Sequence, residues 1–238
     1  YFRARLAPLP PGISAEERGD LLMQPVVADA AAKLAHIHRQ TRGAEGYACA
    51  QVNPGRAGDR DAMLKMARFH HTWADNIAVK LPVTAAGLDV LEECVAEGIT
   101  VTATVSFTVP QAIAVAERHR RGAARARAAD IKPGRCFSVI MIGRLDDYLR
   151  EVAQDNRAAV SEEDIRQAGL AVTKRAYGIY QEAGYEAVLL VAALRGNYHM
   201  TELAGGDLIM SVHPKNQGQL LQPGVPREMR IDRPVPSE

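Results

Sequence analysis

The sequence predicts an α/β fold built on a parallel sheet. Short apolar runs alternate with stretches of helical spacing from Gly46 to about Leu221. The runs are apolar throughout, the pattern of strands buried on both faces of a parallel sheet. The chain has 238 residues, 47% hydrophobic and 24% charged, enough for one large domain or two small ones. We therefore expect six βα-type units.

The first segment, residues 1–45, is predicted to be helical. The apolar positions between Ser14 and Gln40 have helical spacing. Pro25 interrupts that stretch, and since proline removes a backbone donor, two helical pieces are expected. The last segment, residues 223–238, carries four prolines among charged residues and is predicted to be an extended tail.

The βα units are expected in the middle segment, residues 46–222. Apolar runs ended by turn signals predict strands, and stretches of helical spacing predict the helices between them. Ser161 followed by Asp164 forms a capping-box pattern at the start of one long helix. The expected strands are 47–52, 77–81, 99–107, 136–143, 187–193 and 207–212, and the expected helices are 61–73, 85–97, 110–130, 145–152, 162–183 and 198–203.

Composition argues against several classes of partner. The formal net charge is +1, so no global field recruits nucleic acid or an anionic membrane. The basic run from Arg118 to Arg121 is expected to be a solvated helix face. No stretch has the roughly 20 apolar residues of a membrane span, and the start lacks the order of a signal peptide. We expect a cytoplasmic protein, and because the chain opens at Tyr1, it is open whether this is its native start.

Neither a cofactor nor a metal is expected. Three cysteines at wide spacing suit neither a disulfide framework nor a zinc site, and the seven histidines form no ligand pattern with carboxylates. The sequence contains no glycine-rich dinucleotide loop or phosphate-binding loop.

Lys80 is the least expected residue of the predicted strands. It lies inside the run Ile77-Ala78-Val79-Lys80-Leu81, where a charged side chain is costly to bury. Burial favours the neutral amine, the form that attacks a carbonyl. Active residues of barrels stand at the carboxyl ends of strands, which is where Lys80 falls. A lysine that points to solvent is an equally good interpretation of the pattern.

Other polar residues follow the same positional rule. Arg144 and Arg195 each come after an apolar strand, where a guanidinium can clamp a phosphate. Salt bridges to Asp146 or Glu202 are the alternative, and on spacing alone the better supported one. The remaining candidates at strands are Gln51 and Asn53 on the first, and Thr102, Thr104 and Ser106 on the third.

The segment IAVKLPVTAAGLDVLEECVAEGITVTATVSFTVPQAIAVAE resembles the core of transaldolases. The resemblance continues through GRLDD at residues 143–147 and ALRGNYHMTELAGGDLIMSVHP, and covers about Gly46 to Leu221. It implies a (β/α)8 TIM-barrel of the class I aldolase type, with residues 46–222 as the catalytic domain. It also implies that Lys80 is the Schiff-base lysine and that Arg144 and Arg195 bind phosphate.

The implied activity is transfer of a dihydroxyacetone unit between sugar phosphates, as in the pentose phosphate pathway. Lys80 would attack the C2 carbonyl of a ketose phosphate such as fructose 6-phosphate. Thr104 matches a strand threonine that helps to position a catalytic water. No cofactor or metal is needed for this chemistry.

Several positions depart from the family pattern. Gln51 stands where transaldolases usually carry a carboxylate, and glutamine cannot exchange a proton as an acid or base. Related fructose 6-phosphate aldolases have glutamine there, which favours simple aldol cleavage as an alternative. Thr102 replaces a common asparagine, Ala193 a common serine and Met141 an aromatic residue. A non-catalytic sugar-phosphate-binding relative is the third hypothesis.

The largest departure lies at the front of the chain. Family members have two further strands, with an aspartate and a T-N-P turn, and neither is found between Tyr1 and Glu45. Six strands do not close an eight-stranded barrel in the ordinary way. An exposed barrel edge invites self-association, so a homo-oligomer is a possible assembly.

Overall fold

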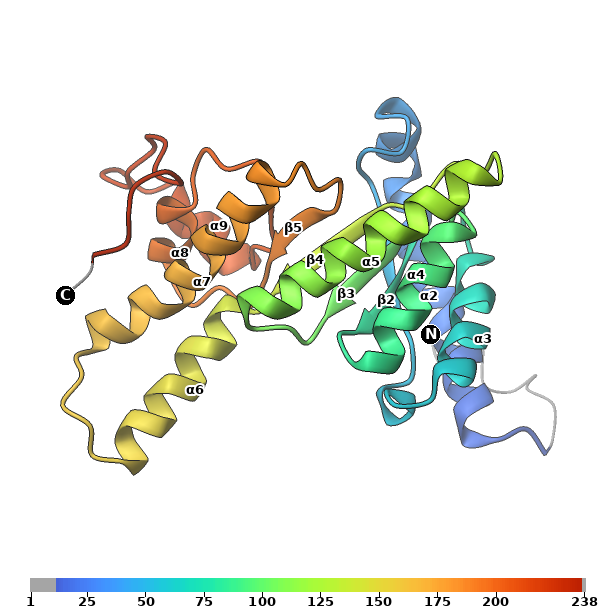
Figure 1. Ribbon diagram of the computed structural model, residues 1–238, viewed down its shortest axis with the longest axis horizontal. Coiled ribbons are helices and arrows are strands. Elements are labelled where there is room, and N and C mark those ends of the chain that lie inside the picture. Colours follow the sequence, from blue (N-terminus) through green and yellow to red (C-terminus); the bar gives the residue numbers. More distant parts are fainter. Residues whose placement is uncertain (1–11, 237–238) are drawn as a thin grey trace. The chain divides into compact units, whose positions relative to one another are not determined.

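The computed structural model describes residues 12–236, and its strands form one sheet in sequence order. The paired segments are parallel, and helices alternate with the strands along the chain (Figure 1). The predicted α/β fold with six parallel strands is confirmed. The strands are β1 (Ala48–Gln51), β2 (Ile77–Pro82), β3 (Val101–Thr104), β4 (Cys136–Ile140), β5 (Val188–Val191) and β6 (Ile209–Met210).

The helices follow the predicted order with small shifts at their ends. They are α2 (Ala15–Gln40), α3 (Arg60–His71), α4 (Ala85–Ala96), α5 (Val109–Ala128), α6 (Ile142–Asp155), α7 (Glu162–Glu182), α8 (Asn197–Glu202) and α9 (Pro214–Leu220), with the short 3₁₀ helix η1 (Pro54–Arg56). The capping box that begins α7 is confirmed, since the Asp164 N–H donates to Ser161 Oγ at 3.1 Å. Helix α9 was missed, although His213 and Pro214 are helix-start residues in its first positions.

The chain divides into two compact units. Of the described residues, 12–102 and 122–135 belong to the first unit, and 103–121 and 136–236 belong to the second. Strand β3 and helix α5 each have residues in both units. Residues 1–11 and 237–238, parts of the expected N-terminal and C-terminal segments, lie outside the described residues.

The expected break of the N-terminal helix at Pro25 is wrong. Helix α2 is continuous from Ala15 to Gln40 with Pro25 inside it. A proline within a helix costs about 3 kcal/mol, and contacts elsewhere in the helix offset this cost. Ser14 and Glu17 form a capping box at its start, and the buried Asn76 donates from Nδ2 to the carbonyl of Ala31 at 2.8 Å. No strand precedes β1 within residues 12–47.

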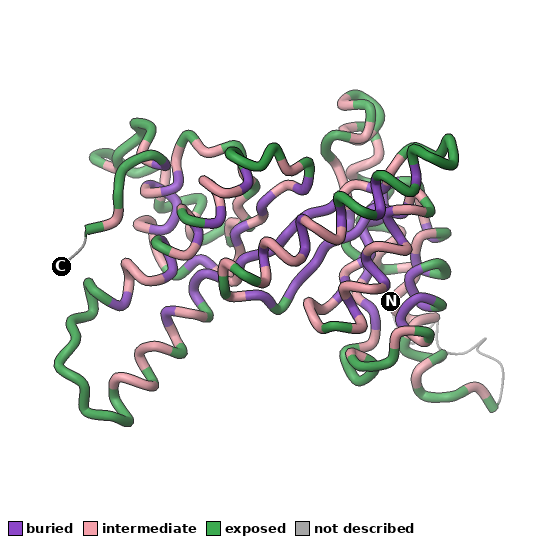
Figure 2. The backbone as a smooth tube through the Cα atoms, in the orientation of Figure 1, coloured by how far each residue is buried: buried purple, intermediate pink, exposed green. Residues whose placement is uncertain are grey.

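The strands of the first unit are the most buried part of it. Figure 2 shows them as a buried core beneath partly exposed helices. All four residues of β3 are buried, as are the first three of β2. Strand β1 pairs with β2 in a register that places Ala48 opposite Ile77 and Gln51 opposite Lys80. This register brings two of the predicted site residues onto neighbouring strands.

In the second unit β4 is buried along its whole length, and it pairs with β5 from Phe137 opposite Val188 to Ile140 opposite Val191. The C-terminal tail from residue 223 has neither helix nor strand up to residue 236. It is nonetheless anchored, because Ile231 is buried and Lys174 Nζ donates to the carbonyls of Arg230 and Arg233 at 2.9 and 2.8 Å.

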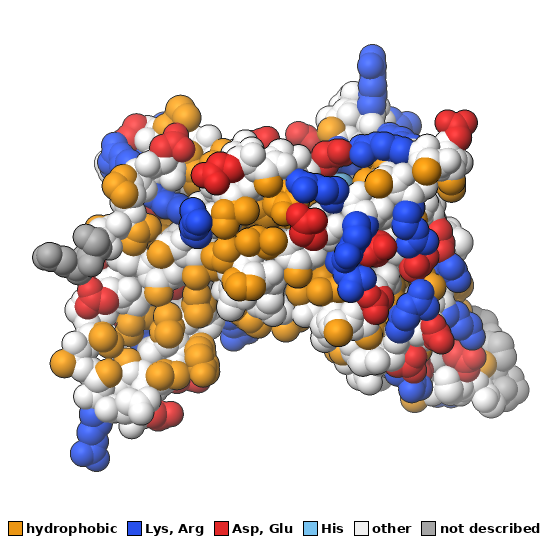
Figure 3. Space-filling model, in the orientation of Figure 1, with side chains coloured by type: hydrophobic (Ala, Val, Ile, Leu, Met, Phe, Trp, Pro, Cys, Tyr) orange, Lys and Arg blue, Asp and Glu red, His pale blue; other side chains and the backbone are white. Residues whose placement is uncertain are grey.

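Several charged side chains of the first unit are paired. Figure 3 shows Lys and Arg interleaved with Asp and Glu over its helices. Arg125, at the end of α5, donates to both carboxylate oxygens of Glu93 at 3.0 and 2.9 Å, and Arg68 pairs with Glu97. In the second unit Arg120, from the predicted basic face, lies over the ring of Tyr185 at 4.3 Å. These basic side chains therefore stabilise their own units.

Lowering the pH from about 7 to 5 is expected to reduce the free energy of unfolding, in part through His70. Its ring is fully buried beside Trp73, and burial lowers the pKa of His70, opposed by Asp20 at 3.3 Å. As the pH is lowered, the unfolded chain, with a histidine pKa of about 6.5, binds the proton before the folded protein does. At pH values below about 6.5 the free energy of unfolding therefore decreases, by at most about 1.4 kcal/mol per pH unit. Chemical denaturation across this range measures the slope.

The variant His70→Gln is expected to show a shallower slope than the wild-type protein. His36 is exposed on α2, so His36→Gln serves as the matched control and is expected to keep the wild-type slope. Equal slopes for the wild-type protein and His70→Gln would contradict this assignment.

Candidate active site

Lys80 lies near the carboxyl end of β2, as predicted. Its neighbours Val79 and Leu81 are fully buried on one side of the strand, whereas Lys80 is half-buried on the other. Within the described part of the chain, the Lys80 ammonium forms no ion pair and no hydrogen bond. The amine is therefore held on a rigid strand without a partner that would occupy it.

Gln51 lies directly opposite Lys80 on β1. Its Nε2 donates to the backbone carbonyl of Lys80 at 3.0 Å and to that of Val52 at 3.2 Å. These bonds fix the side-chain amide against the backbone of the lysine. Among described residues, Gln51 Oε1 accepts no hydrogen bond and remains available to a water or a hydroxyl group.

The other predicted residues of the first unit differ in their surroundings. Thr102 is buried on β3, and its Oγ1 lies 3.5 Å from Cys49 Sγ. Asn53 accepts from the Gly55 N–H at 2.9 Å and donates to Glu16 Oε1 at 2.9 Å. Its side chain thus caps η1 and ties this turn to α2.

In the second unit, Arg144 and Arg195 share one carboxylate. Arg195 Nε lies 3.0 Å from Asp147 Oδ1, and Arg144 Nη1 lies 3.8 Å from Asp147 Oδ2. The hydrogen bond from Arg195 holds the pKa of Asp147 below its usual range and raises that of Arg195. The alternative prediction from the sequence was that these arginines form salt bridges with Asp146 or Glu202. In the structure, Asp147 is the carboxylate that both arginines approach.

A buried polar network supports the backbone at Arg195. The Arg195 N–H donates to His199 Nδ1 at 3.1 Å, and His199 Nε2 lies 3.0 Å from Asp146 Oδ2. Tyr198 donates its hydroxyl to the same Asp146 oxygen at 2.7 Å, and burial raises the pKa of Tyr198. Asp146 and His199 are fully buried. The sequence analysis did not identify this network, although the adjacent carboxylates of GRLDD were a usable signal.

Arg195 also lines a cavity of about 440 Å³ in the second unit. Ser211, His213 and Asn216 contribute polar side chains to the same cavity. A guanidinium beside hydroxyl, imidazole and amide groups provides donors for an oxyanion. These side chains are of the kinds that bind phosphate oxygens in proteins.

Thr104 and Ser106 belong to the second unit, at the end of β3 and just after it. Both are buried, and Ser106 Oγ donates to the carbonyl of Val139 on β4. The Ser106 hydroxyl is thus engaged with a neighbouring strand. Lys80 and the two arginines belong to different units.

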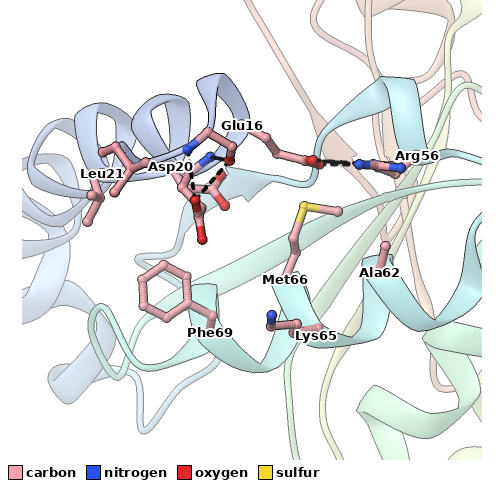
Figure 4. Close-up of a pocket in the computed structure, with 11 residues that line it drawn as sticks. Glu16, Asp20, Leu21, Arg56, Ala62, Lys65, Met66 and Phe69 are labelled. Carbon is pink, nitrogen blue, oxygen red and sulfur yellow. Dashed lines mark hydrogen bonds and ion pairs between the residues drawn. The ribbon is translucent and has the colours of Figure 1, made fainter. Parts of the chain in front are cut away.

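A larger cavity, of about 670 Å³, lies between α2 and α3 of the first unit (Figure 4). Its walls include the apolar side chains of Leu21, Met66 and Phe69, and Figure 4 shows Glu16 joined to Arg56, an ion pair of 2.9 Å. None of the residues predicted from the sequence as site residues lines it.

Among residues 12–236 no cluster of three or more histidine, cysteine, aspartate or glutamate side chains could hold a metal ion. No helix within the same range is both long and apolar enough to cross a membrane.

The sequence profile of the transaldolase/fructose-6-phosphate aldolase family matches residues 12–232. A probable transaldolase of Dehalococcoides mccartyi is 30% identical over 179 residues, which are 75% of this chain and 67% of that protein. A transaldolase of Thiobacillus denitrificans is 28% identical, over 76% of this chain and 52% of its own. A probable transaldolase of Rhodospirillum centenum is 34% identical, over 62% of this chain and 51% of its own. The chain thus spans between about half and two thirds of the length of these relatives.

Proposed function

Because this chain belongs to the transaldolase/fructose-6-phosphate aldolase family, we propose that it is a transaldolase-type transferase that acts through a Schiff base on Lys80. It moves a dihydroxyacetone unit from a ketose phosphate to an aldose phosphate. The observation that carries the proposal is the position of Lys80, half-buried near the carboxyl end of β2 and free of ion pairs within the described residues.

The reaction begins when the neutral amine of Lys80 attacks the C2 carbonyl of a ketose phosphate such as fructose 6-phosphate. Loss of water from the carbinolamine gives an iminium ion. The iminium accepts the electron pair of the C3–C4 bond as that bond breaks and the C4 hydroxyl loses its proton. An aldose phosphate leaves, and a three-carbon enamine remains on Lys80.

A second aldose phosphate completes the transfer. The enamine carbon attacks its aldehyde, the new alkoxide takes up a proton, and water then hydrolyses the iminium to release the product ketose. Thr104 and Gln51 are proposed to position that water. Gln51 Oε1 is suited to this role because Gln51 binds the backbone of Lys80 through Nε2.

The phosphate groups are proposed to bind Arg144 and Arg195. The shared Asp147 holds the Arg195 guanidinium in place, and Arg144 is exposed. Guanidinium groups bind phosphate oxygens through paired hydrogen bonds. Thr102, Ser106 and Asn53 are proposed as residues that shape the site around the substrate.

Simple aldol cleavage is the second candidate, and Gln51 favours it. A glutamine cannot take or give a proton, so the steps that need an acid or base depend on water or substrate. If the three-carbon enamine is protonated and hydrolysed before an acceptor arrives, dihydroxyacetone is released and the protein acts as a lyase.

Product analysis with Gln51→Glu separates the two reactions. With fructose 6-phosphate and an acceptor aldose phosphate, we expect the wild-type protein to form the exchanged ketose phosphate at least tenfold faster than it releases dihydroxyacetone. Gln51→Glu is expected to raise the transfer rate by about tenfold or more, because a positioned acid–base group typically contributes 10²- to 10⁴-fold.

Gln40→Glu is the matched control, since Gln40 is exposed at the end of α2. It is expected to leave both rates unchanged. Accumulation of dihydroxyacetone at the same rate with and without acceptor would establish the lyase. Reversible sugar-phosphate binding without turnover would support a non-catalytic relative.

A further inference from the structure

A separate cavity of the first unit, of about 440 Å³, lies at the amino-terminal ends of its strands. It is lined by residues just before β1, β2 and β3, by the last turn of α2 and the turn after it, and by residues of the segment 132–135. Asp75, in its wall, is five positions before Lys80. Asp75 precedes the amino-terminal end of β2 and Lys80 lies near its carboxyl end, so this cavity is distinct from the site around Lys80.

Four cationic side chains and only one carboxylate line this cavity, which we call the basic pocket. The carboxylate belongs to Asp75, and the cations are Arg39, Arg42, Lys132 and Arg135. Among the described residues, Arg39, Arg42 and Lys132 form no ion pair. Like charges gathered in a concave wall raise the local positive potential and attract an anion.

Several arginines elsewhere in the first unit are neutralised by nearby carboxylates. Arg56 pairs with Glu16 at 2.9 Å, and Arg125 pairs with Glu93 at 2.9 Å. The chain carries 29 basic and 28 acidic residues, so acidic partners are not scarce. The excess of positive charge in the basic pocket is therefore local and is not a property of the whole surface.

The turn that carries Arg42 is held by several hydrogen bonds. The Gly43 N–H donates to the His38 carbonyl at 2.8 Å, and the Tyr47 hydroxyl donates to the Gly43 carbonyl at 2.7 Å. Arg42 has a φ of +53°, a left-handed conformation that is unfavourable for an arginine. The rings of His38 and Tyr47 meet edge to face at 4.8 Å and form one wall.

We propose that the basic pocket binds a small phosphorylated compound. Arg39, Arg42 and Lys132 bind its phosphate oxygens through charge-assisted hydrogen bonds, and the rings of His38 and Tyr47 contact its organic part. The cavity volume falls within the usual range for small-molecule sites, about 300 to 1,000 Å³. This site does not depend on chemistry at Lys80.

Titration calorimetry with inorganic pyrophosphate at low ionic strength tests the proposal. Arg195→Gln protein is used beside the wild-type protein, so that the guanidinium proposed to hold the substrate phosphate is absent. We expect saturable binding to Arg195→Gln with a stoichiometry near one. Adding Arg42→Gln and Lys132→Gln is expected to raise the dissociation constant at least tenfold. Arg39 is left in place, because a cation in the last turn also stabilises α2.

The matched control adds Arg157→Gln and Lys33→Gln to the same Arg195→Gln protein. It removes the same charge outside the pocket, and Arg157 also has a left-handed backbone, with φ of +50°. The control is expected to keep the dissociation constant within about twofold of its parent. Absence of saturable binding to Arg195→Gln, or equal weakening in the control and test variants, would overturn the proposal.

Discussion

Lys80→Met is expected to abolish cleavage of fructose 6-phosphate, with a loss of about 10³-fold or more in turnover. The change keeps an unbranched side chain of similar length on β2 but removes the only atom proposed to form a covalent bond with the substrate. Without the iminium, the C3–C4 electrons have no sink, so binding and orientation alone remain. Aldehyde phosphate release, followed in a coupled assay, gives the rate.

Lys65→Met is the control for this experiment. Lys65 is exposed on α3 of the same unit, so its loss removes one lysine without touching β2. Wild-type activity is expected in this variant. If Lys80→Met kept more than about a tenth of the wild-type rate, Lys80 would not be the nucleophile.

Gly143→Ala is expected to destabilise the protein by about 2 kcal/mol or more. A Cβ at Gly143 would lie 1.9 Å from the carbonyl oxygen of Ala193 and 2.7 Å from Arg195 Cγ. The first clash is with backbone, which cannot move aside as the tip of a side chain does, and overpacking of this kind costs several kcal/mol in the worst cases. The loop that carries Arg195 has to shift, so phosphate binding is expected to weaken as well.

Gly178→Ala offers a matched control within the same unit. Gly178 lies inside α7, and nothing is within 4 Å of a Cβ built there. Since alanine has a higher helix propensity than glycine, this variant is expected to gain about 0.5 to 1 kcal/mol. Thermal unfolding followed by circular dichroism measures both changes. A melting temperature for Gly143→Ala equal to that of the wild-type protein would contradict the predicted clash.

The strands were predictable from the sequence because each is an apolar run with turn residues beside it. Their ends were less so: the run 99–107 predicted a strand that the structure confines to Val101–Thr104. Apolar composition does not mark the residue at which pairing stops. The expected break at Pro25 failed for a related reason, since contacts such as Asn76 with Ala31, 45 positions apart, stabilise α2.

The candidate site was partly predictable. Lys80 and Gln51 stood out as polar residues at the ends of apolar runs, and the structure pairs them on β1 and β2. The partner of Arg195 was not predictable, because Asp147 is 48 positions away and Asp146 beside it is equally acidic. Asp147 faces Arg195, whereas Asp146 is buried with His199. This difference is decided by the packing of α6 against the loop that carries Arg195.

Borohydride trapping tests the central claim most directly. The protein is incubated with fructose 6-phosphate, reduced, and examined by intact mass and peptide mapping, with Lys80→Ala as the control and circular dichroism to show that both are folded. The account predicts one reduced three-carbon adduct on the peptide that contains Lys80, absent from Lys80→Ala. No adduct in folded wild-type protein, or an adduct on a different lysine, would contradict it.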